Sequence, residues 1–141
     1  IVYFKALLDV FGDEAFNKMF STIYLMNWRY LPTELSMTGR MQKTKTYLPG
    51  DRRYLTNPEV DPQTPEWQGE NVIDLGNGRY YGHGMGRRTI DEIVRALNQN
   101  RFAGARREAY LLDTVGRPDF RRLFREYQRS RTQQVAYRWV S

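Results

Sequence analysis

A glycine-flanked turn between two short strand-forming segments constrains the fold of this chain more than any other feature. The turn is Gly76-Asn77-Gly78, and Asn-Gly readily adopts the positive φ angles that a tight two-residue hairpin turn requires. The two arms are rich in β-branched, aliphatic and aromatic residues, namely Val72, Ile73 and Leu75 before the turn and Tyr80 and Tyr81 after it. These segments are predicted to form an antiparallel hairpin.

The register of this hairpin decides which side chains share a face of the sheet. A two-residue turn pairs Leu75 with Tyr80, Asp74 with Tyr81 and Val72 with His83. One face then carries Glu70, Val72, Asp74, Tyr81 and His83, and the other carries Asn71, Ile73, Leu75, Tyr80 and Gly82. A three-residue turn would instead put His83 with Ile73 and Leu75, opposite Glu70. The first register separates apolar from polar residues more cleanly, so it is the one we predict.

Glu70 and His83, the only histidine, are the candidate catalytic pair. In the predicted register they are diagonal neighbours, with backbones about 7–8 Å apart. A carboxylate can act as a general base when a partly desolvated site raises its pKa. The glycines beside His83 would let a substrate approach closely. From the residues alone, however, a single histidine beside a glycine-rich hairpin is more typical of a structural role. Trp67 either lines the cleft or anchors the core.

Composition excludes several classes of function. The absence of cysteine rules out disulfides and zinc–thiolate sites within the chain, and a single histidine argues against other metal sites, so no cofactor is expected. No apolar segment is long enough for a transmembrane helix. The net charge is +6, and 18 of the 22 basic residues are arginines. We interpret this bias as genomic base composition; the alternative is a basic surface for nucleic acid or an acidic partner.

Helices are predicted on both sides of the hairpin. Residues 1–11 show helical periodicity, and Asp13 can cap a second helix that reaches about Thr22. Thr89 and Glu92 have the spacing of a capping box, which predicts a helix that ends near Asn100. Pro118 is predicted to begin a helix that reaches about Gln128. Its inward residues would be Phe120, Leu123, Phe124 and Tyr127.

The remaining segments are less regular. Residues 23–28 are predicted to be a short strand or a helix end, 47–51 a turn and 54–55 a strand. Residues 31–45 are predicted to be a long loop, either a lid bordering the substrate or a surface insertion. Residues 108–113 form a buried strand or a short helix. In the tail, Val135, Tyr137 and Trp139 alternate as in a strand, which could be an edge strand, a partner-binding segment or a membrane-surface contact.

Two motifs carry a family resemblance. They are Trp67-Gln68-Gly69-Glu70-Asn71-Val72-Ile73 and Tyr80-Tyr81-Gly82-His83-Gly84-Met85-Gly86. With residues 3–20, 57–63 and 109–124, they resemble the bacterial spore-coat type of protein-glutamine γ-glutamyltransferase (transglutaminase). The resemblance implies an α/β (α+β) fold like that of papain-like small cysteine peptidases, with an antiparallel sheet packed against helices. Residues 1–128 would be the C-terminal part of a single catalytic domain, and 129–141 an extra tail.

The resemblance also implies an activity. The family joins a glutamine side chain to a lysine amine through a thioester on a cysteine, and its motifs assign catalytic roles to Glu70 and His83. Trp67, Asn71 and Tyr81 would support substrate binding. Because this chain has no cysteine, we expect it to be a fragment, with the thiol on a separate N-terminal segment shortly before Ile1. The other partners would be proteins that present glutamine and lysine.

Two alternatives stay open from the sequence. The same fold could hydrolyse the thioester and deamidate glutamine, as in a secreted bacterial toxin or effector, whereas the crosslinking family is cytoplasmic or in the spore coat. The second alternative is a non-catalytic binding module that uses the arginine-rich surface.

Overall fold

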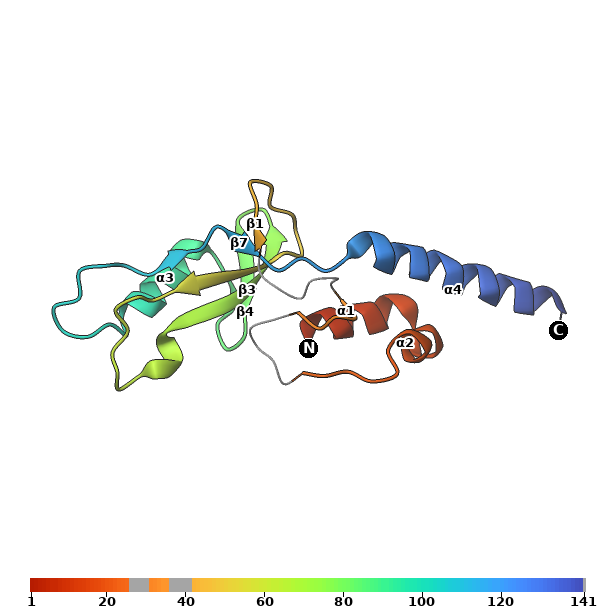
Figure 1. Ribbon diagram of the computed structural model, residues 1–141, viewed down its shortest axis with the longest axis horizontal. Coiled ribbons are helices and arrows are strands. Elements are labelled where there is room, and N and C mark those ends of the chain that lie inside the picture. Colours follow the sequence, from red (N-terminus) through yellow and green to blue (C-terminus); the bar gives the residue numbers. More distant parts are fainter. Residues whose placement is uncertain (26–30, 36–41, 141) are drawn as a thin grey trace. The chain divides into compact units, whose positions relative to one another are not determined.

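The computed structural model describes residues 1–25, 31–35 and 42–140, which form two compact units (Figure 1). One unit comprises residues 41–117 and contains the strands. The other comprises residues 1–40 and 118–141 and is helical. Each unit has its own hydrophobic core, and each is described separately below.

The strand-containing unit is built on a five-stranded antiparallel sheet in the order β5-β4-β3-β2-β6. The strands are β2 (Arg52–Thr56), β3 (Gly69–Gly76), β4 (Arg79–Gly82), β5 (Gly86–Arg88) and β6 (Tyr110–Leu111). A separate two-stranded ladder joins β1 (Gln42–Lys43) to β7 (Thr114–Val115), and a 3-10 turn, η1 (Pro65–Trp67), precedes β3. The predicted hairpin is therefore confirmed as β3 and β4, and 108–113 contains a strand rather than a helix.

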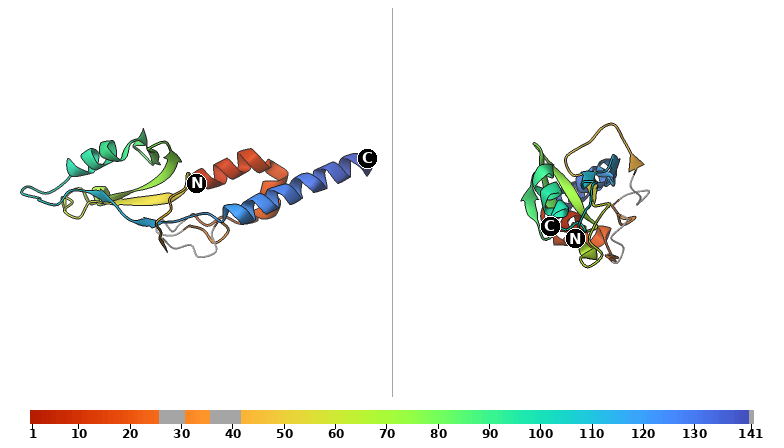
Figure 2. Two further views of the ribbon diagram at one scale, coloured as in Figure 1. Left: turned by 90° about the horizontal axis from the view of Figure 1, so that it is seen from above. Right: turned by 90° about the vertical axis from the view of Figure 1, so that its left-hand side faces the viewer.

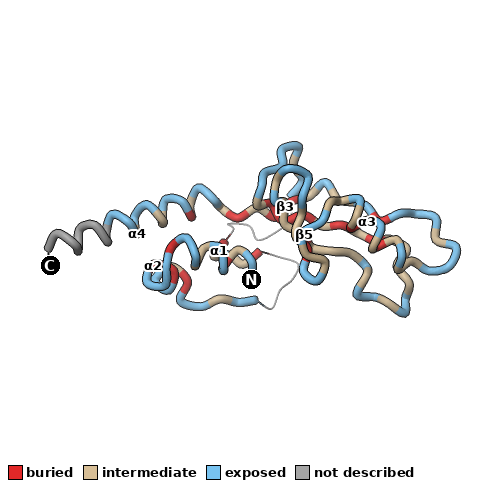
Figure 3. The backbone as a smooth tube through the Cα atoms, turned by 180° about the vertical axis from the view of Figure 1, so that it is seen from behind, coloured by how far each residue is buried: buried red, intermediate tan, exposed pale blue. Residues whose placement is uncertain are grey.

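One face of the sheet is covered by helix α3 (Ile90–Asn98), as the left view of Figure 2 shows. The capping box predicted at its start is present, since the Thr89 side chain accepts from the Glu92 amide and the Glu92 carboxylate accepts from the Thr89 amide. The helix packs its apolar face against the sheet, and the tube in Figure 3 is buried where the two meet. The core under α3 consists of Leu55, Val72, Ile93, Leu97 and Ala109.

The register of the β3–β4 hairpin differs by one residue from the predicted register. The turn is the expected two-residue turn, with φ of 53° at Asn77 and 70° at Gly78. The pairing shifts between Asp74 and Gly76, so Leu75 is an extra residue on β3. A bulge of this kind slides every later pair by one position and exchanges the faces of the second strand. Asp74 consequently pairs with Tyr80, Ile73 with Tyr81 and Val72 with Gly82.

The three predicted pairs are therefore wrong, because Tyr80 pairs with Asp74, Tyr81 with Ile73 and Val72 with Gly82. Tyr80 and Gly82 lie on the α3-covered face with Val72, and Tyr81 lies on the opposite face. The predicted division into an apolar and a polar face was also wrong. The residue buried under α3 is Val72, while Leu75 is exposed.

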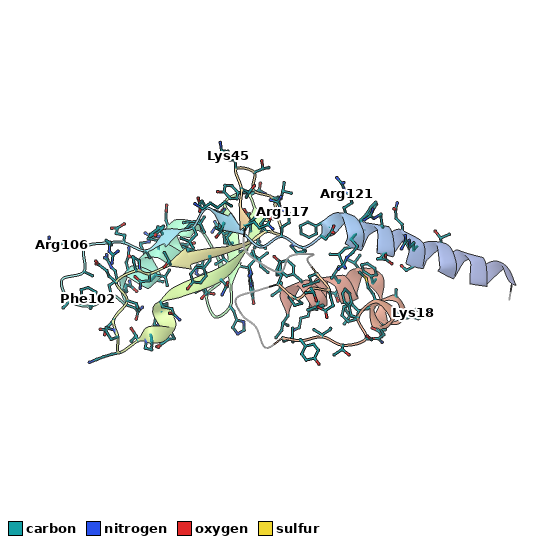
Figure 4. The ribbon with its side chains drawn as sticks, viewed as in Figure 1. Lys18, Lys45, Phe102, Arg106, Arg117 and Arg121 are labelled. Atoms are coloured by element: carbon teal, nitrogen blue, oxygen red, sulfur yellow. The ribbon has the colours of Figure 1, made fainter. Side chains whose placement is uncertain are left out.

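An ion pair with a fully buried carboxylate fixes the loop before β2. The Arg117 guanidinium donates to both carboxylate oxygens of Asp51, at 2.6 and 2.7 Å, and Asp51 has no exposed surface. The Leu48 amide also donates to Asp51, which closes the turn predicted at 47–51. Figure 4 shows Arg117 near the end of the strand-containing unit and Lys45 projecting from the loop that this ion pair holds.

The helical unit packs three helices around a cluster of phenylalanines. They are α1 (Val2–Phe11), α2 (Asp13–Met19) and α4 (Phe120–Val140). Their shared core is Phe4, Phe11, Ala15, Phe16, Phe20, Leu35 and Leu123. The first helix is confirmed, and Gly12 ends it with a φ of 77°. The second helix ends earlier than predicted, at Met19, and Asp13 lies in its first turn rather than at its cap.

Helix α4 corrects the prediction for the tail. It continues through Val140 without a break, so the strand expected from Val135, Tyr137 and Trp139 is wrong. No glycine or proline follows Pro118, and the arginines and glutamines of the tail favour helix, so nothing stops propagation at Gln128. Pro118 precedes the helix rather than beginning it, and Asp119 caps it by accepting from the Arg122 amide at 2.9 Å.

Only part of the predicted inward face of α4 is buried. Leu123 is buried and Tyr127 packs against the core. Phe120 and Phe124 remain 40% and 59% exposed, so their predicted burial was wrong.

Some expectations fall outside the described residues. Residues 36–41, in the middle of the predicted lid, are among them, so the lid stays a prediction. Of the segment 23–28, residues 26–28 are not described, and 23–25 form neither strand nor helix. Within the described part of the chain, no helix is long and apolar enough to cross a membrane.

Candidate active site

Glu70 is the second residue of β3, and strand register sets its direction. It pairs with Leu55 on β2, and residues of a pair project to the same face of a sheet. Leu55 and Val72 lie in the core beneath α3, so the Glu70 side chain projects to this covered face as well. The sequence thus places one carboxylate at the margin of an apolar layer.

Burial makes the Glu70 carboxyl group a weaker acid than an ordinary glutamate. Desolvation raises the pKa of Glu70 from its ordinary value of 4.5 to about 7, because ionisation is costly away from water. A hydrogen bond from the backbone N–H of His83 acts in the opposite direction, since it stabilises the charged form. A carboxyl group with a pKa near 7 can take up or release a proton at neutral pH, as a general base must.

His83 lies in the turn that connects β4 and β5, not on a strand. Gly82, the last residue of β4, pairs with Gly86, the first residue of β5, so the turn consists of His83, Gly84 and Met85. Gly84 and Gly86 adopt φ angles of 89° and 71°, which only glycine adopts without strain. The structure brings His83 to Glu70 through the His83 backbone N–H, while the residue itself is exposed.

The three predicted substrate-binding residues are divided between the two faces of the sheet. Trp67 is partly buried and packs against the core beneath α3, on the face that Glu70 shares. Asn71 pairs with Tyr54 on the opposite face, as predicted. Tyr81 also lies on that opposite face, in contrast to the prediction. Their roles in binding substrate stay predictions.

Sequence reasoning missed a second polar group on the covered face. Tyr80 lies there together with Asp74, its cross-strand partner. Desolvation raises the pKa of the Tyr80 hydroxyl, and the charge of Asp74 and a side-chain hydrogen bond to it add to the effect. The sequence contained one sign of the shifted register, the glycine at position 76. Gly76 adopts a φ of 78° next to the bulge, which extends the positive-φ turn by one residue.

No metal centre accompanies these groups in the part of the chain that the structure describes. Among the described residues, no three histidine, cysteine or acidic side chains lie close enough together to hold a metal ion. The chemistry available on this face is that of a half-buried carboxyl group, a hydrogen-bond donor from a glycine-rich turn and an aromatic neighbour.

The strand-containing unit combines an antiparallel sheet, a helix over one face and a half-buried carboxyl group at the margin of that face. Comparison with solved structures identifies the fold as the papain-like fold of bacterial transglutaminases. A transglutaminase from Geobacillus stearothermophilus, solved without its C-terminal extension, superimposes with a TM-score of 0.74 at 43% sequence identity. The match covers 86% of this chain and 56% of that one.

The chain belongs to the protein-glutamine γ-glutamyltransferase family, whose model matches residues 1–128. It is 41% identical, over an alignment of 143 positions, to a protein-glutamine γ-glutamyltransferase of Bacillus cereus strain G9842, and 44% identical over 124 positions to one from strain 03BB102. These alignments cover 99% and 86% of this chain, but 49% and 43% of the relatives. The chain therefore spans about half the length of the curated relatives it matches.

Proposed function

We propose that this chain is part of an enzyme that crosslinks proteins by joining glutamine side chains to lysine amines. The observation that carries the proposal is the half-buried Glu70 carboxyl, whose pKa of about 7 suits proton transfer at neutral pH. Membership of the family supports it, because the relatives bear the name of this activity.

The chain has no cysteine, so the nucleophilic thiol would come from outside these 141 residues. In the proposed reaction, Glu70 accepts the proton of that thiol. The resulting thiolate attacks the glutamine carboxamide carbon, Glu70 returns its proton to the leaving nitrogen, and the C–N bond breaks to release ammonia and leave a thioester. A lysine amine then attacks the thioester carbon and its proton passes to the Glu70 carboxylate. The C–S bond breaks as the isopeptide bond forms, and Glu70 returns this proton to the departing thiolate.

Glu70 suits both steps because its two protonation states are nearly equal in free energy near pH 7. The His83 amide stabilises the ionised form and keeps the carboxylate available as a base. We assign His83 a secondary role, because the residue is exposed and its backbone, rather than its imidazole, bonds to Glu70. Trp67 would help to exclude water from this side of the sheet.

The test uses the full-length protein that contains this chain, a glutamine-donor protein and a labelled primary amine. Glu70→Gln should lower amine incorporation by about 10²–10⁴-fold, the usual contribution of general acid–base catalysis. Glu66→Gln is the matched control, since it removes an exposed carboxylate four residues away. Substitution of the cysteine expected before Ile1 should abolish incorporation.

Three outcomes would contradict the proposal. Release of ammonia without amine incorporation would identify a glutamine deamidase instead. Absence of both products, or absence of a cysteine in the full-length protein, would leave a non-catalytic module.

A further inference from the structure

Gly82 lies beside Glu70 on the covered face of the sheet. It pairs with Val72 on β3, and Glu70 is two residues before Val72. Residues in this diagonal relation share a face and lie within reach of a long side chain. Gly82 is buried, so the space above its Cα atom is occupied by protein rather than by solvent.

The group in that space is the Glu70 side chain. A Cβ atom built on Gly82 would lie 2.9 Å from Glu70 Oε1, 3.3 Å from Cγ and 3.4 Å from Cδ. The first distance is shorter than real Cβ contacts, so any side chain at position 82 would force the carboxyl group to move. The end of a glutamate side chain is flexible, so the carboxyl group would move before the strand does.

Backbone conformation does not explain this glycine, unlike its neighbours. Gly84 and Gly86 have positive φ angles, and a Cβ atom added to either would meet nothing within 4 Å. Gly82 shows the reverse, with a φ that any residue adopts and a crowded Cβ position. The motif around His83 thus contains glycines of two kinds. Gly84 and Gly86 provide the positive φ angles of the turn, whereas Gly82 leaves space for the Glu70 side chain.

We propose that Gly82 is a positioning residue, whose missing side chain lets the Glu70 carboxyl lie across β4 within reach of the His83 amide. Its importance for catalysis rests on the function proposed for Glu70. Gly82 touches no reacting atom in this scheme and acts only through the place that it gives to Glu70. An alanine here should drive the carboxyl group out toward solvent and away from the His83 N–H.

The experiment measures the position of Glu70 through its own titration. The 141-residue chain, labelled with ¹³C at the glutamate side-chain carboxyl, is titrated by NMR, and Glu70→Gln identifies the Glu70 resonance. In the wild-type chain the midpoint should be about 7. In Gly82→Ala it should fall by about one unit or more, because desolvation is the main cause of the raised pKa and the carboxyl group moves into water.

A thermal-unfolding cycle separates this contact from a general effect of alanine in a strand. At pH 4.5, where the folded chain holds the Glu70 carboxyl group in its uncharged form, Gly82→Ala should lower Tm in the wild-type background but have much less effect in a Glu70→Ala background, where no carboxyl group occupies the space. If Gly82→Ala fails to fold alone but folds together with Glu70→Ala, the contact is demonstrated in the same way.

A Glu70 midpoint that stays near 7 or rises in Gly82→Ala would overturn the proposal. Equal losses of Tm in both backgrounds, or failure of both variants to fold, would do so too. Neither measurement needs a thiol or a substrate. Failure of the positioning role is therefore distinguishable from failure of the proposed crosslinking activity.

Discussion

Glu70 should make the strand-containing unit less stable at neutral pH than in mild acid. Its pKa is about 7 in the folded chain and 4.5 at its ordinary value, so the native state binds more protons between these two pH values. Stability then falls as pH rises through this window. The full difference is worth about 3 kcal/mol. Since Glu70 is only half-buried, partial solvent screening reduces our expectation to about 2 kcal/mol.

Glu70→Gln isolates this contribution. Glutamine resembles the protonated carboxyl and keeps an oxygen for the His83 amide, but it does not titrate. Near pH 4.5 the variant and the wild type should have equal stability. At pH 8 the variant should be more stable by about 2 kcal/mol, because the wild type must hold a desolvated charge.

Urea unfolding from pH 4.5 to 8.5, followed by tryptophan fluorescence, would measure this difference. Trp67 is the only tryptophan in residues 41–117, so replacing Trp28 and Trp139 by phenylalanine makes the signal specific to the strand-containing unit. Glu66→Gln controls for the loss of one exposed carboxylate. The reasoning is refuted if the difference between Glu70→Gln and wild type does not change with pH, or if the wild type gains stability relative to the variant as pH rises.

Three further substitutions test the framework around the site. Arg117→Ala leaves the buried Asp51 carboxylate without its ion-pair partner and should cost about 3–5 kcal/mol in urea unfolding; a loss under 1 kcal/mol would show that water replaces the guanidinium. Thr89→Ala removes the capping box of α3 and should cost about 1 kcal/mol, whereas an unchanged Tm would mean that Glu92 alone suffices. Leu97→Ala opens a cavity in the fully buried layer between α3 and the sheet and should cost about 2–5 kcal/mol; a fluorescence midpoint close to wild type would show that the layer collapses around it.

The local signals in the sequence predicted α3 and the hairpin well. Thr89 and Glu92 satisfy each other within one helical turn, so their spacing alone determines the geometry. Asn77-Gly78 likewise determines its turn through its own backbone preference. Both features depend on residues a few positions apart and on no tertiary contact.

The register and the tail depended on more than local pattern. The bulge at Leu75 leaves the turn unchanged but exchanges the faces of Tyr80 and Tyr81, and alternation of side chains does not reveal an inserted residue. In the tail, the prediction gave more weight to the alternation of polar and apolar residues over 135–139 than to the helical propensity of a segment without glycine. In the structure, α4 continues through these residues. The role of Gly82 could not be predicted for the same reason, because its neighbour on the covered face follows from the shifted register.

The order of the strands also bears on how this unit avoids association with copies of itself. An edge strand exposes unpaired backbone groups that can pair with another chain. Here the edges are β6, with two residues, and β5, with three, and β5 carries the consecutive exposed charges of Arg87 and Arg88. Short and positively charged edges pair poorly with one another. The longest strand, β3, lies in the middle of the sheet. Its backbone groups are hydrogen-bonded to β2 on one side and β4 on the other, so they are not available to pair with another chain.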